Sequence, residues 1–497
     1  MRKIGIVASR SSITDAYVIL NEGEERNVKA EDLVLIKNLN GNSILGVCRF
    51  GRGLDENLEV GGRYRPGVAY ARMGMTPSDS KRHYIFKILV IADVTSTFEE
   101  NKLIIAPGSD IFVFEDEDNP MKYFAKGIEL SEGKLITISY YRGKENWKVP
   151  INPEYISRHI WVTGVTGSGK SYLVKYEIIP ALRKADYDIL IFDWKGDDYV
   201  PHFNKLKSDA IVKLSEIALD EGVVINYLFS KTRYFGYFSE ERVAQSIRMA
   251  LEEAIFELPW REKNLDELQS FLGNSIVNNI RGRTREETER MRRRFQIYWN
   301  RLSKKDFEVI KGTMTPEELL ESVREKHIVV LDLSAGGSEE KLSVFLSIAE
   351  YLEDLMARER QTLNLALIID EGPQYCPYNP KGLQVQVTEK IKNLCALGRA
   401  YKLAIVIVSQ GMAGAIGISP AVRRNLNTQF MGKLHPLDIS EAEKLLGRQG
   451  VNIDMLTRLP VGHFYFFGSM NPSPIPLLIS FKPDESKLAE ALGGSSD

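Results

Sequence analysis

A glycine-rich loop is the first stretch of the sequence whose residue types and spacing suggest chemistry. Residues 164–171 read GVTGSGKS and satisfy the pattern G-x-x-x-x-G-K-[ST], directly after the apolar run IWVT at 160–163. The backbone N–H groups of such a loop turn toward phosphate oxygens, and the following helix offers its positive end. We therefore expect Lys170 to reach the β- and γ-phosphates of a nucleotide and the Ser171 hydroxyl to bind Mg²⁺.

The motif predicts a set of residues in contact with the nucleotide. They are Gly164, Val165, Thr166, Gly167, Ser168, Gly169, Lys170, Ser171 and Tyr172. A chance Gly-rich turn is the alternative interpretation, which the order of strand, loop and helix disfavours. Pro180 falls inside the helix expected after the loop, and it should kink or end that helix near Ile178.

An acidic pair supplies the metal-binding half of a phosphate-transfer site. The apolar run LALII ends in Asp370, and Glu371 follows directly. We expect Asp370 to orient metal-bound water and Glu371 to polarise the water that attacks the γ-phosphate. The alternative is that the pair caps a helix, which acidic residues after a buried strand often do.

Two further strand ends carry polar side chains. ILIF ends in Asp193, at the edge where ligands of open α/β sheets gather, so this carboxylate could stand behind the metal site. A solvated turn explains Asp193 equally well. Gln410 follows LAIVIVS and is able to sense the γ-phosphate, although a Gln at a strand end is more often an ordinary loop residue.

The elements that must position these residues are buried parallel strands. Runs at 160–163, 189–193, 328–333, 365–370 and 403–409 are almost continuously apolar, and amphipathic helical stretches lie between them. A phosphate loop after the first of these strands indicates a doubly wound α/β domain.

The remaining segments differ in pattern from this core. Short β-like runs separated by Gly, Asn and Asp before about residue 94 indicate a small, closed or nearly closed β-barrel, while helical periodicity dominates from 239 to 325. We divide the chain into a barrel (1–100), a connecting β segment (101–150), a first core part (151–238), a helical insertion (239–325), a second core part (326–485) and a disordered tail (486–497).

Composition excludes several classes of function. The 497 residues carry 65 basic and 67 acidic side chains, so the total charge of −2 does not by itself indicate nucleic acid. No apolar run is long enough to cross a bilayer and no secretory signal begins the chain, which makes a cytoplasmic protein without membrane contact the expectation. The three cysteines have no spacing that suits zinc or a disulfide framework.

Together the motifs resemble the HerA branch of the HerA/FtsK family of hexameric DNA-pumping ATPases. The resemblance rests on SRHIWVTGVTGSGKS, FDWKGDDY, IIDEGPQY and LGRAYKLAIVIVSQ and on the β-rich N-terminal region. It implies a RecA-like P-loop NTPase domain with a small, HAS-barrel-like N-terminal barrel and a helical insertion. It further implies ATP and Mg²⁺ as cofactors, and a pair of family acidic positions at Asp193 and Asp198.

The resemblance also implies roles for individual side chains. Arg158 lies where HerA-like proteins are expected to offer an arginine across the subunit boundary, and Arg399 matches the arginine of the family's G-R-K/R segment. The catalytic residues would be Lys170, Glu371, Gln410, Arg158 and Arg399, and the metal ligands Ser171 and Asp370. This sequence departs from the family where Ala400 replaces a basic residue, where DEGPQY lacks the usual His, and where Trp194 and Asp198 replace Pro and Glu.

The function implied is that of a homohexameric translocase or helicase on double-stranded DNA. By the same resemblance it would act in DNA end processing or repair and dock a nuclease of the NurA type through the barrel. The alternative is a nucleotide-switched protein scaffold or remodelling ATPase that does not act on DNA, which the near-neutral charge favours. A third interpretation, a membrane-coupled conjugation pump, is disfavoured because the sequence has no transmembrane segment.

A basic segment is a candidate DNA contact. In residues 280–304 arginines outnumber glutamates, and Phe295, Tyr298 and Trp299 add aromatic faces that could stack bases. The alternative is a solvated helical face with intrahelical ion pairs. Other candidates follow Glu371, namely Lys381, Lys390 and Lys392.

Overall fold

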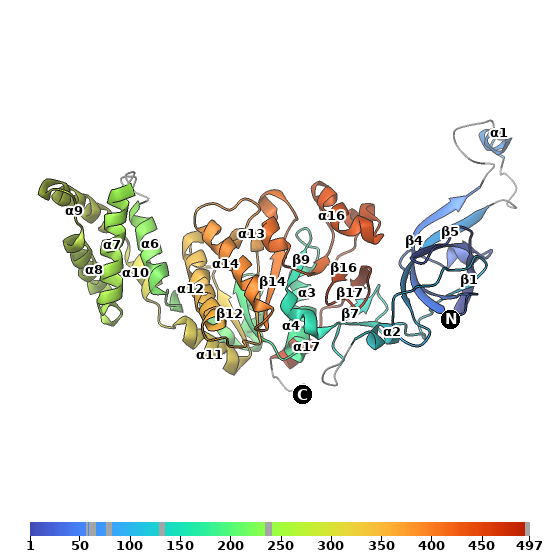
Figure 1. The fold of residues 1–497 in the computed structure, drawn as a ribbon, viewed down its shortest axis with the longest axis horizontal. Coiled ribbons are helices and arrows are strands. Elements are labelled where there is room, and N and C mark those ends of the chain that lie inside the picture. Colours follow the sequence, from blue (N-terminus) through green and yellow to red (C-terminus); the bar gives the residue numbers. More distant parts are fainter. Residues whose placement is uncertain (56–57, 59–65, 76–81, 129–134, 234–240, 493–497) are drawn as a thin grey trace.

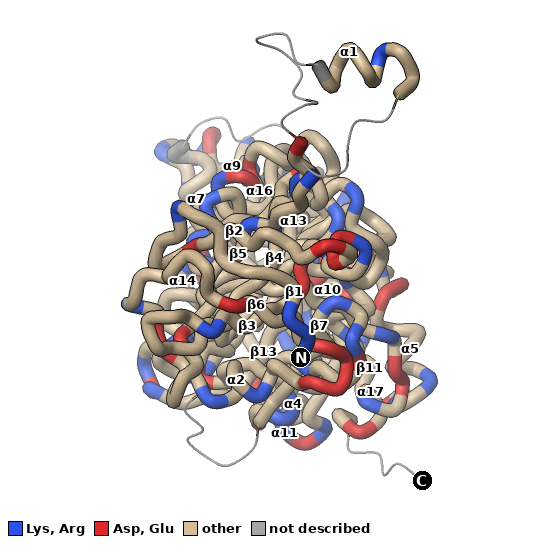
Figure 2. The backbone as a smooth tube through the Cα atoms, turned by 90° about the vertical axis from the view of Figure 1, so that its right-hand side faces the viewer, with Lys and Arg blue, Asp and Glu red and all other residues tan. Residues whose placement is uncertain are grey.

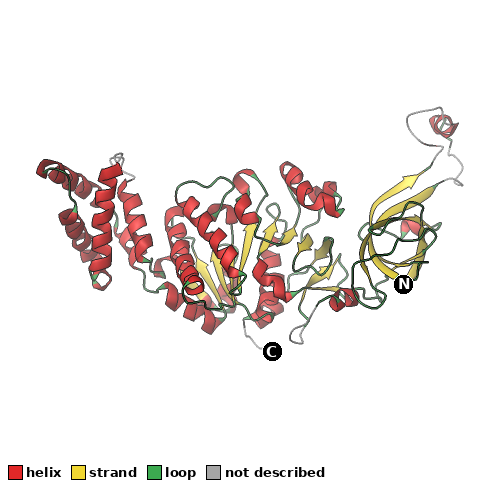
Figure 3. Cartoon of the chain, viewed as in Figure 1, coloured by secondary structure: helices red, strands yellow, loops and turns green. Residues whose placement is uncertain are grey.

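The computed structural model of the chain places three regions along one long axis. It describes residues 1–55, 58, 66–75, 82–128, 135–233 and 241–492. A group of helices occupies one end, an α/β core lies in the middle, and a barrel of strands occupies the other end (Figure 1). The distribution of helices and strands follows the same division (Figure 3).

The core is built on a sheet of eleven strands. In spatial order they are β11 (Ile211–Lys213), β12 (Ile328–Asp332), β10 (Asp188–Asp193), β13 (Leu365–Ile369), β14 (Leu403–Ser409), β9 (Ile160–Thr163), β15 (Thr428–Met431), β16 (His463–Gly468), β17 (Leu477–Ser480), β7 (Thr137–Tyr141) and β8 (Lys148–Pro150). The strands from β11 to β15 pair in parallel, and those from β15 to β8 pair in antiparallel fashion.

Apolar runs make this sheet because both of its faces are covered. Along β13, Leu367 and Ile369 enter one apolar core while Ile368 enters another on the opposite face. Continuous apolar strands are stable only under such double cover. The helices of the core are α3 (Lys170–Leu173), α4 (Ile179–Lys184), α5 (Val200–Leu206), α12 (Ser338–Ala357), α13 (Gly372–Tyr375), α14 (Leu383–Gly398), α15 (Pro420–Arg423), α16 (Ile439–Leu446) and α17 (Glu485–Ala491). The expected α/β fold is confirmed.

The N-terminal region is a closed barrel, as expected. Its strands, in order round the barrel, are β1 (Arg2–Val7), β2 (Asp15–Leu20), β5 (His83–Asp93), β4 (Ser43–Leu54), β3 (Leu33–Lys37) and β6 (Asp110–Val113). Helix α1 (Pro66–Arg72) lies between β4 and β5 in the sequence, and α2 (Met121–Lys126) follows β6.

The segment expected only to connect barrel and core belongs to both. β6 pairs with β1 and with β3 and so closes the barrel beyond the boundary placed at residue 100. Strands β7 and β8 of the same segment join the core sheet instead. The physical reason is that an open barrel would expose unpaired edges on β1 and β3, which β6 satisfies.

The helical region begins earlier than residue 239, because α6 packs against α7 in the same apolar core. Its helices are α6 (Glu221–Arg233), α7 (Glu241–Glu257), α8 (Leu265–Asn279), α9 (Arg285–Trp299), α10 (Lys304–Lys311) and α11 (Pro316–Lys326). Phe295 and Trp299 are buried there, with ring centroids 5.5 Å apart. They hold helices together and are therefore not exposed, so the interpretation that their rings stack on bases is wrong for these two residues.

Two local expectations meet different outcomes. The helix after the phosphate loop changes at Pro180 as expected, since a π-helical turn over Val174–Ile178 separates α3 from α4. The extra residue in that turn accommodates the ring of Pro180, whose backbone nitrogen has no hydrogen to donate. The tail expected to be disordered from residue 486 instead forms α17, which Asp484 caps and whose Leu488 is buried. Residues 493–497 lie outside the described part of the chain.

A buried ion pair ties the barrel to the core. Arg49 on β4 donates from Nε to Glu31 Oε1 at 2.9 Å and from Nη2 to Glu31 Oε2 at 3.0 Å. The same guanidinium reaches the carbonyls of Pro476 at 2.6 Å and Gln449 at 3.3 Å, both in the core. Tyr465 on β16 donates to Glu31 Oε1 at 3.0 Å. These buried hydrogen bonds therefore fix the position of the barrel against the C-terminal part of the core.

Charge is spread over the molecule in both signs. Seen from the barrel end, basic and acidic residues are interspersed along the backbone (Figure 2), in keeping with the net charge of −2. Among the described residues, no helix combines the length and the apolar character that crossing a membrane requires.

Candidate active site

Four parallel strands bring the predicted phosphate-transfer residues to one edge of the sheet. β14 lies between β9 and β13, and β10 lies on the far side of β13. Because parallel strands end at the same edge, the phosphate loop after β9 meets Gln410 after β14 and the acidic pair after β13. They surround a cavity of about 440 Å³.

Six of the nine residues expected to touch nucleotide line this cavity: Thr166, Gly167, Gly169, Lys170, Ser171 and Tyr172. The other three shape the loop from behind. A side chain on Gly164 would meet the Ser168 hydroxyl at 2.8 Å, and the N–H of Val165 donates to the carbonyl of Lys433 at 2.8 Å.

Glycine is required in the loop where the backbone adopts a left-handed conformation. Gly167 has φ of 78° and Gly169 has φ of 99°, which other residues adopt only with strain. Lys170 is nearly buried, and its ammonium donates to the carbonyl of Val165 at 3.1 Å. Burial lowers the pKa of Lys170, and the charges of Asp370 and Glu371 oppose that shift. The loop thus holds a poorly hydrated cation at the place where phosphates would lie.

Asp370 is suited to a divalent cation. Its carboxylate is buried, and its Oδ2 atom has no hydrogen-bond partner among the described residues. Burial, followed by the charges of Asp198, Asp193 and Glu371, raises the pKa of Asp370 to about 8. Mg²⁺ is usually held by one or two protein oxygens together with phosphates and water, so Asp370 and Ser171 fit as its protein ligands.

Glu371 is held by side chains from both neighbouring strand ends. Gln410 donates from Nε2 to Glu371 Oε1 at 2.9 Å and to Oε2 at 3.2 Å, and Thr166 donates to Gln410 Oε1 at 3.1 Å. The ammonium of Lys195 pairs with Glu371 Oε1. Glu371 itself has φ of 50°, a conformation that few non-glycine residues adopt and that is often found at functional sites.

The loop after β10 is organised by Asp193, which is fully buried. Asp193 accepts hydrogen bonds from the backbone N–H of Gly196 at 2.9 Å, of Tyr199 at 2.8 Å and of Val200 at 3.1 Å. It therefore acts as the anchor of this loop and does not line the cavity, whereas Asp198 and Lys195 on the same loop do. Lys195 was missed from the sequence, because a lysine in a polar turn has no distinguishing pattern.

The C-terminal segment supplies a wall of the cavity that no motif predicted. Val461, Gly462, Phe481 and Pro483 line it. The N–H of Gly462 donates to the carbonyl of Ser168 at 3.0 Å, so this wall touches the phosphate loop directly. No sequence pattern signals the contact, because it depends on where β16 and β17 add to the sheet.

The two candidate arginines lie away from this cavity. Neither Arg158 nor Arg399 is among the described residues that line it. Arg158 ends the 3₁₀ turn before β9, and Arg399 follows α14 and is exposed. Both stand near the amino ends of β9 and β14, opposite to the phosphate loop.

His159 ties the two arginine-bearing segments together. Its Nδ1 accepts from the N–H of Ile405 at 3.2 Å, and its Nε2 donates to the carbonyl of Cys395 at 2.8 Å. Burial lowers the pKa of His159 to about 4, so the ring is neutral near pH 7.

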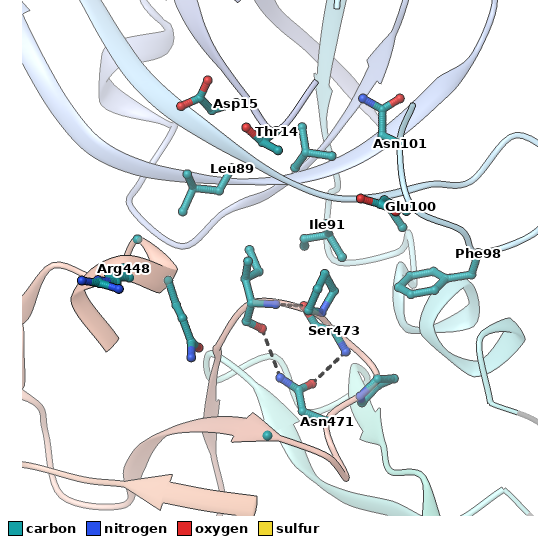
Figure 4. Close-up of a pocket in the computed structure, with 18 of the residues that line it drawn as sticks. Thr14, Asp15, Leu89, Ile91, Phe98, Glu100, Asn101, Arg448, Asn471 and Ser473 are labelled. Carbon is teal, nitrogen blue, oxygen red and sulfur yellow. Dashed lines mark hydrogen bonds between the residues drawn. The ribbon is translucent and has the colours of Figure 1, made fainter. Parts of the chain in front are cut away.

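Arg158 faces a second hollow, of about 1150 Å³, between barrel and core. Figure 4 shows Leu89 and Ile91 of the barrel above it and Asn471 and Ser473 of the core below. Arg158 lies over the ring of Tyr155, with 4.1 Å between its guanidinium carbon and the ring centroid. Asn471 accepts from the N–H of Ser473 at 3.0 Å and donates to the carbonyl of Ile475 at 3.1 Å, so the polar groups of this floor satisfy one another.

Comparison with known proteins gives a family model and a fold. Residues 133–351 match the family model described as "Helicase HerA, central domain". The structure of VirB4 of Thermoanaerobacter pseudethanolicus is similar with a TM-score of 0.51 and 13% identity, covering 72% of this chain and 99% of that chain. No curated protein sequence matches the chain.

Two further structures are similar at lower scores. The plasmid coupling protein TrwB, in complex with the GTP analogue GDPNP, has a TM-score of 0.47 and 14% identity over 74% of this chain and 93% of that chain. The genome packaging NTPase B204 from Sulfolobus turreted icosahedral virus 2 has a TM-score of 0.33 and 13% identity over 66% and 98%. The similarity to VirB4, at 13% identity, shows the fold alone, which is that of an α/β P-loop NTPase.

Proposed function

Because the chain belongs to the HerA/FtsK superfamily of P-loop ATPases, we propose that it hydrolyses Mg-ATP to move double-stranded DNA through a ring of six copies. The proposal includes action as a translocase or helicase in DNA end processing or repair. The observation that carries it is the position of Arg158 and Arg399 at the edge of the sheet opposite to the phosphate loop.

The cavity residues divide the work of hydrolysis. Lys170 would bind the β- and γ-phosphates, and Glu371 would take the proton of the attacking water. Gln410 bridges Thr166 of the phosphate loop and Glu371, so a change at the γ-phosphate would reach the carboxylate through one side chain. Mg²⁺, when bound by Ser171 and Asp370, would neutralise charge that develops on the phosphates.

A trans arginine explains why the cavity alone is incomplete. Charge spreads over the γ-phosphoryl oxygens in the transition state, and an inserted guanidinium raises the rate by about 10³- to 10⁵-fold. No arginine is among the described residues that line the cavity, so a guanidinium from a neighbouring copy would supply this charge. Head-to-tail contacts of this kind close into rings when the rotation allows it.

The ion pairs of the basic residues distinguish among the candidate DNA contacts. On α9, Arg285 pairs with Glu289 at 3.5 Å, as expected for a solvated helical face. Lys390 pairs with Glu353 at 2.5 Å and Lys392 with Glu389 at 2.8 Å, which leaves the exposed Lys381 as the better candidate of the three after Glu371. We further propose that the barrel, at the outer end of the molecule, docks a nuclease of the NurA type.

The direct test is ATP turnover with and without long duplex DNA at low salt. We expect stimulation, together with DNA binding whose affinity falls steeply as salt rises, because phosphate contacts release counterions. Turnover that ignores duplex DNA, with salt-independent binding, would favour the protein-remodelling alternative.

A mixing experiment tests the shared cavity. Glu371→Gln should bind ATP but stall hydrolysis, and Arg158→Ala should lower turnover when Arg158 is the trans residue. In a random mixture of the two inactive variants, about a quarter of the seams would combine an intact Glu371 with an intact Arg158 from the neighbour, so activity should return. Arg399→Ala replaces Arg158→Ala in a parallel mixture. If neither mixture recovers activity, the shared cavity is refuted.

A further inference from the structure

Lys195 is a second cation in the nucleotide cavity, and none of the expected roles includes it. It lines the same cavity as Lys170, and its ammonium pairs with Glu371. The side chain is half exposed, with a relative accessibility of 50%, whereas that of Glu371 is 14%. A long, half-exposed side chain retains rotamer freedom, so its tip can change partners within the cavity.

The backbone that carries Lys195 is held on both sides. Asp193 fixes the turn through the N–H of Gly196, and the carbonyl of Trp194 accepts from Lys341 at 2.7 Å. Gly196 has φ of 74°, and a side chain there would meet Ser334 at 2.8 Å, so the turn admits little rearrangement. Lys195 therefore combines a rigid backbone with a long side chain that can change rotamer.

The contacts of Glu371 leave one of its two oxygens without room for water. Oε1 accepts from both Lys195 and Gln410, and Oε2 accepts from Gln410 at 3.2 Å. A carboxylate that takes a proton from water needs an oxygen free to accept that water. Oε2 keeps room for one water, whereas Oε1 becomes available to water only when Lys195 moves away.

A γ-phosphate is the partner that would draw Lys195 away. It carries more negative charge than a carboxylate and offers several acceptor oxygens to an ammonium. ADP lacks this group, so the exchange would occur only with a triphosphate. We propose that Lys195 is a positioning residue that holds Glu371 until a triphosphate binds and then donates to the γ-phosphate, which frees Glu371 for water. This inference rests on the proposed hydrolysis of ATP.

The test compares equilibrium binding of the Mg²⁺ complexes of ADP and of β,γ-methylene ATP by calorimetry. In Lys195→Met we expect the triphosphate analogue to bind about 10-fold more weakly, the usual loss of a hydrogen bond to a charged group, while ADP stays within about twofold. Lys195→Arg should recover most of the loss. Lys205→Met, an exposed lysine on α5 outside the cavity, is the matched control and should change neither affinity.

A second background separates contact with the phosphate from an effect through Glu371. In Glu371→Gln, a lysine that acts only by pairing with Glu371 would have nothing left to contribute, whereas one that binds the γ-phosphate would still favour the triphosphate. Equal weakening of both nucleotides, or a ratio unchanged by Lys195→Met, would overturn the proposal. The measurement needs no DNA, so a failure of DNA translocation and a failure of this inference remain distinguishable.

Discussion

Two clusters of charged groups, one at the joint between barrel and core and one in the nucleotide cavity, differ in how completely their atoms are paired. At the joint, Nε, Nη1 and Nη2 of Arg49 all donate, and both carboxylate oxygens of Glu31 accept. In the cavity Asp370 Oδ2, and directly behind the phosphate loop Ser168 Oγ, have no hydrogen-bond partner among the described residues. A fully paired cluster fixes structure, whereas a buried cluster with open atoms is suited to receive a ligand.

The largest expected effect is a loss of ATP turnover, and it tests the role of the nucleotide cavity. Lys170→Ala should lower ATP turnover by at least about 10³-fold, because the β- and γ-phosphates lose their cation. Thermal unfolding should show no loss of stability, since burial already disfavours this ammonium. Turnover close to that of Lys205→Met would contradict the assignment.

Arg49→Met tests the paired cluster at the joint, where we expect a loss of stability and not of ATP turnover. Removing one partner leaves the Glu31 carboxylate buried and uncompensated, which should cost about 3–5 kcal/mol of unfolding free energy. Denaturant titration measures it. The double variant Arg49→Met with Glu31→Gln should lose less, because no lone charge remains. A single variant as stable as the unchanged protein would show that the pair does not hold the barrel on the core.

Much of this contrast could not be predicted from sequence, although the motifs themselves could. The phosphate loop, Asp370, Glu371 and Gln410 were placed correctly at one edge of a sheet because each follows a recognisable apolar strand. The chain pattern around Lys195 and Val461 is ordinary, and their place in the cavity depends on long-range pairing. The same reason explains β6, whose role in closing the barrel follows from the free edges of two distant strands.

His159 gives a pH-dependent prediction. Its pKa is lowered from 6.5 to about 4 in the folded chain, so the unfolded chain binds the extra proton first as pH falls. The contribution of His159 is complete above pH 6.5 and is lost between pH 6.5 and about 4, by about 3 kcal/mol in all. His159→Asn, which tolerates the φ of 65°, should reduce this acid sensitivity in denaturant titrations at several pH values. The exposed His435→Asn is the control, and equal acid sensitivity in both variants would refute the role.

The smallest expected effect has the opposite sign to that of Arg49→Met. Ser168→Ala removes a buried hydroxyl that has no partner among the described residues, so stability should stay constant or rise by about 1 kcal/mol. A clear loss of unfolding free energy would mean that this hydroxyl is paired, and the comparison between the two clusters would then break down.

The order of strands in the core sheet has a consequence for how the protein is made. The strand before the phosphate loop, β9, is flanked by β14 and β15, whose residues lie more than 240 positions later in the chain. A nascent chain leaving the ribosome therefore leaves both hydrogen-bonding edges of β9 unpaired until β14 and β15 have been synthesised. We expect the nucleotide cavity to be one of the last features to form during synthesis, and chaperones that shield β-edges to matter for the yield of active protein.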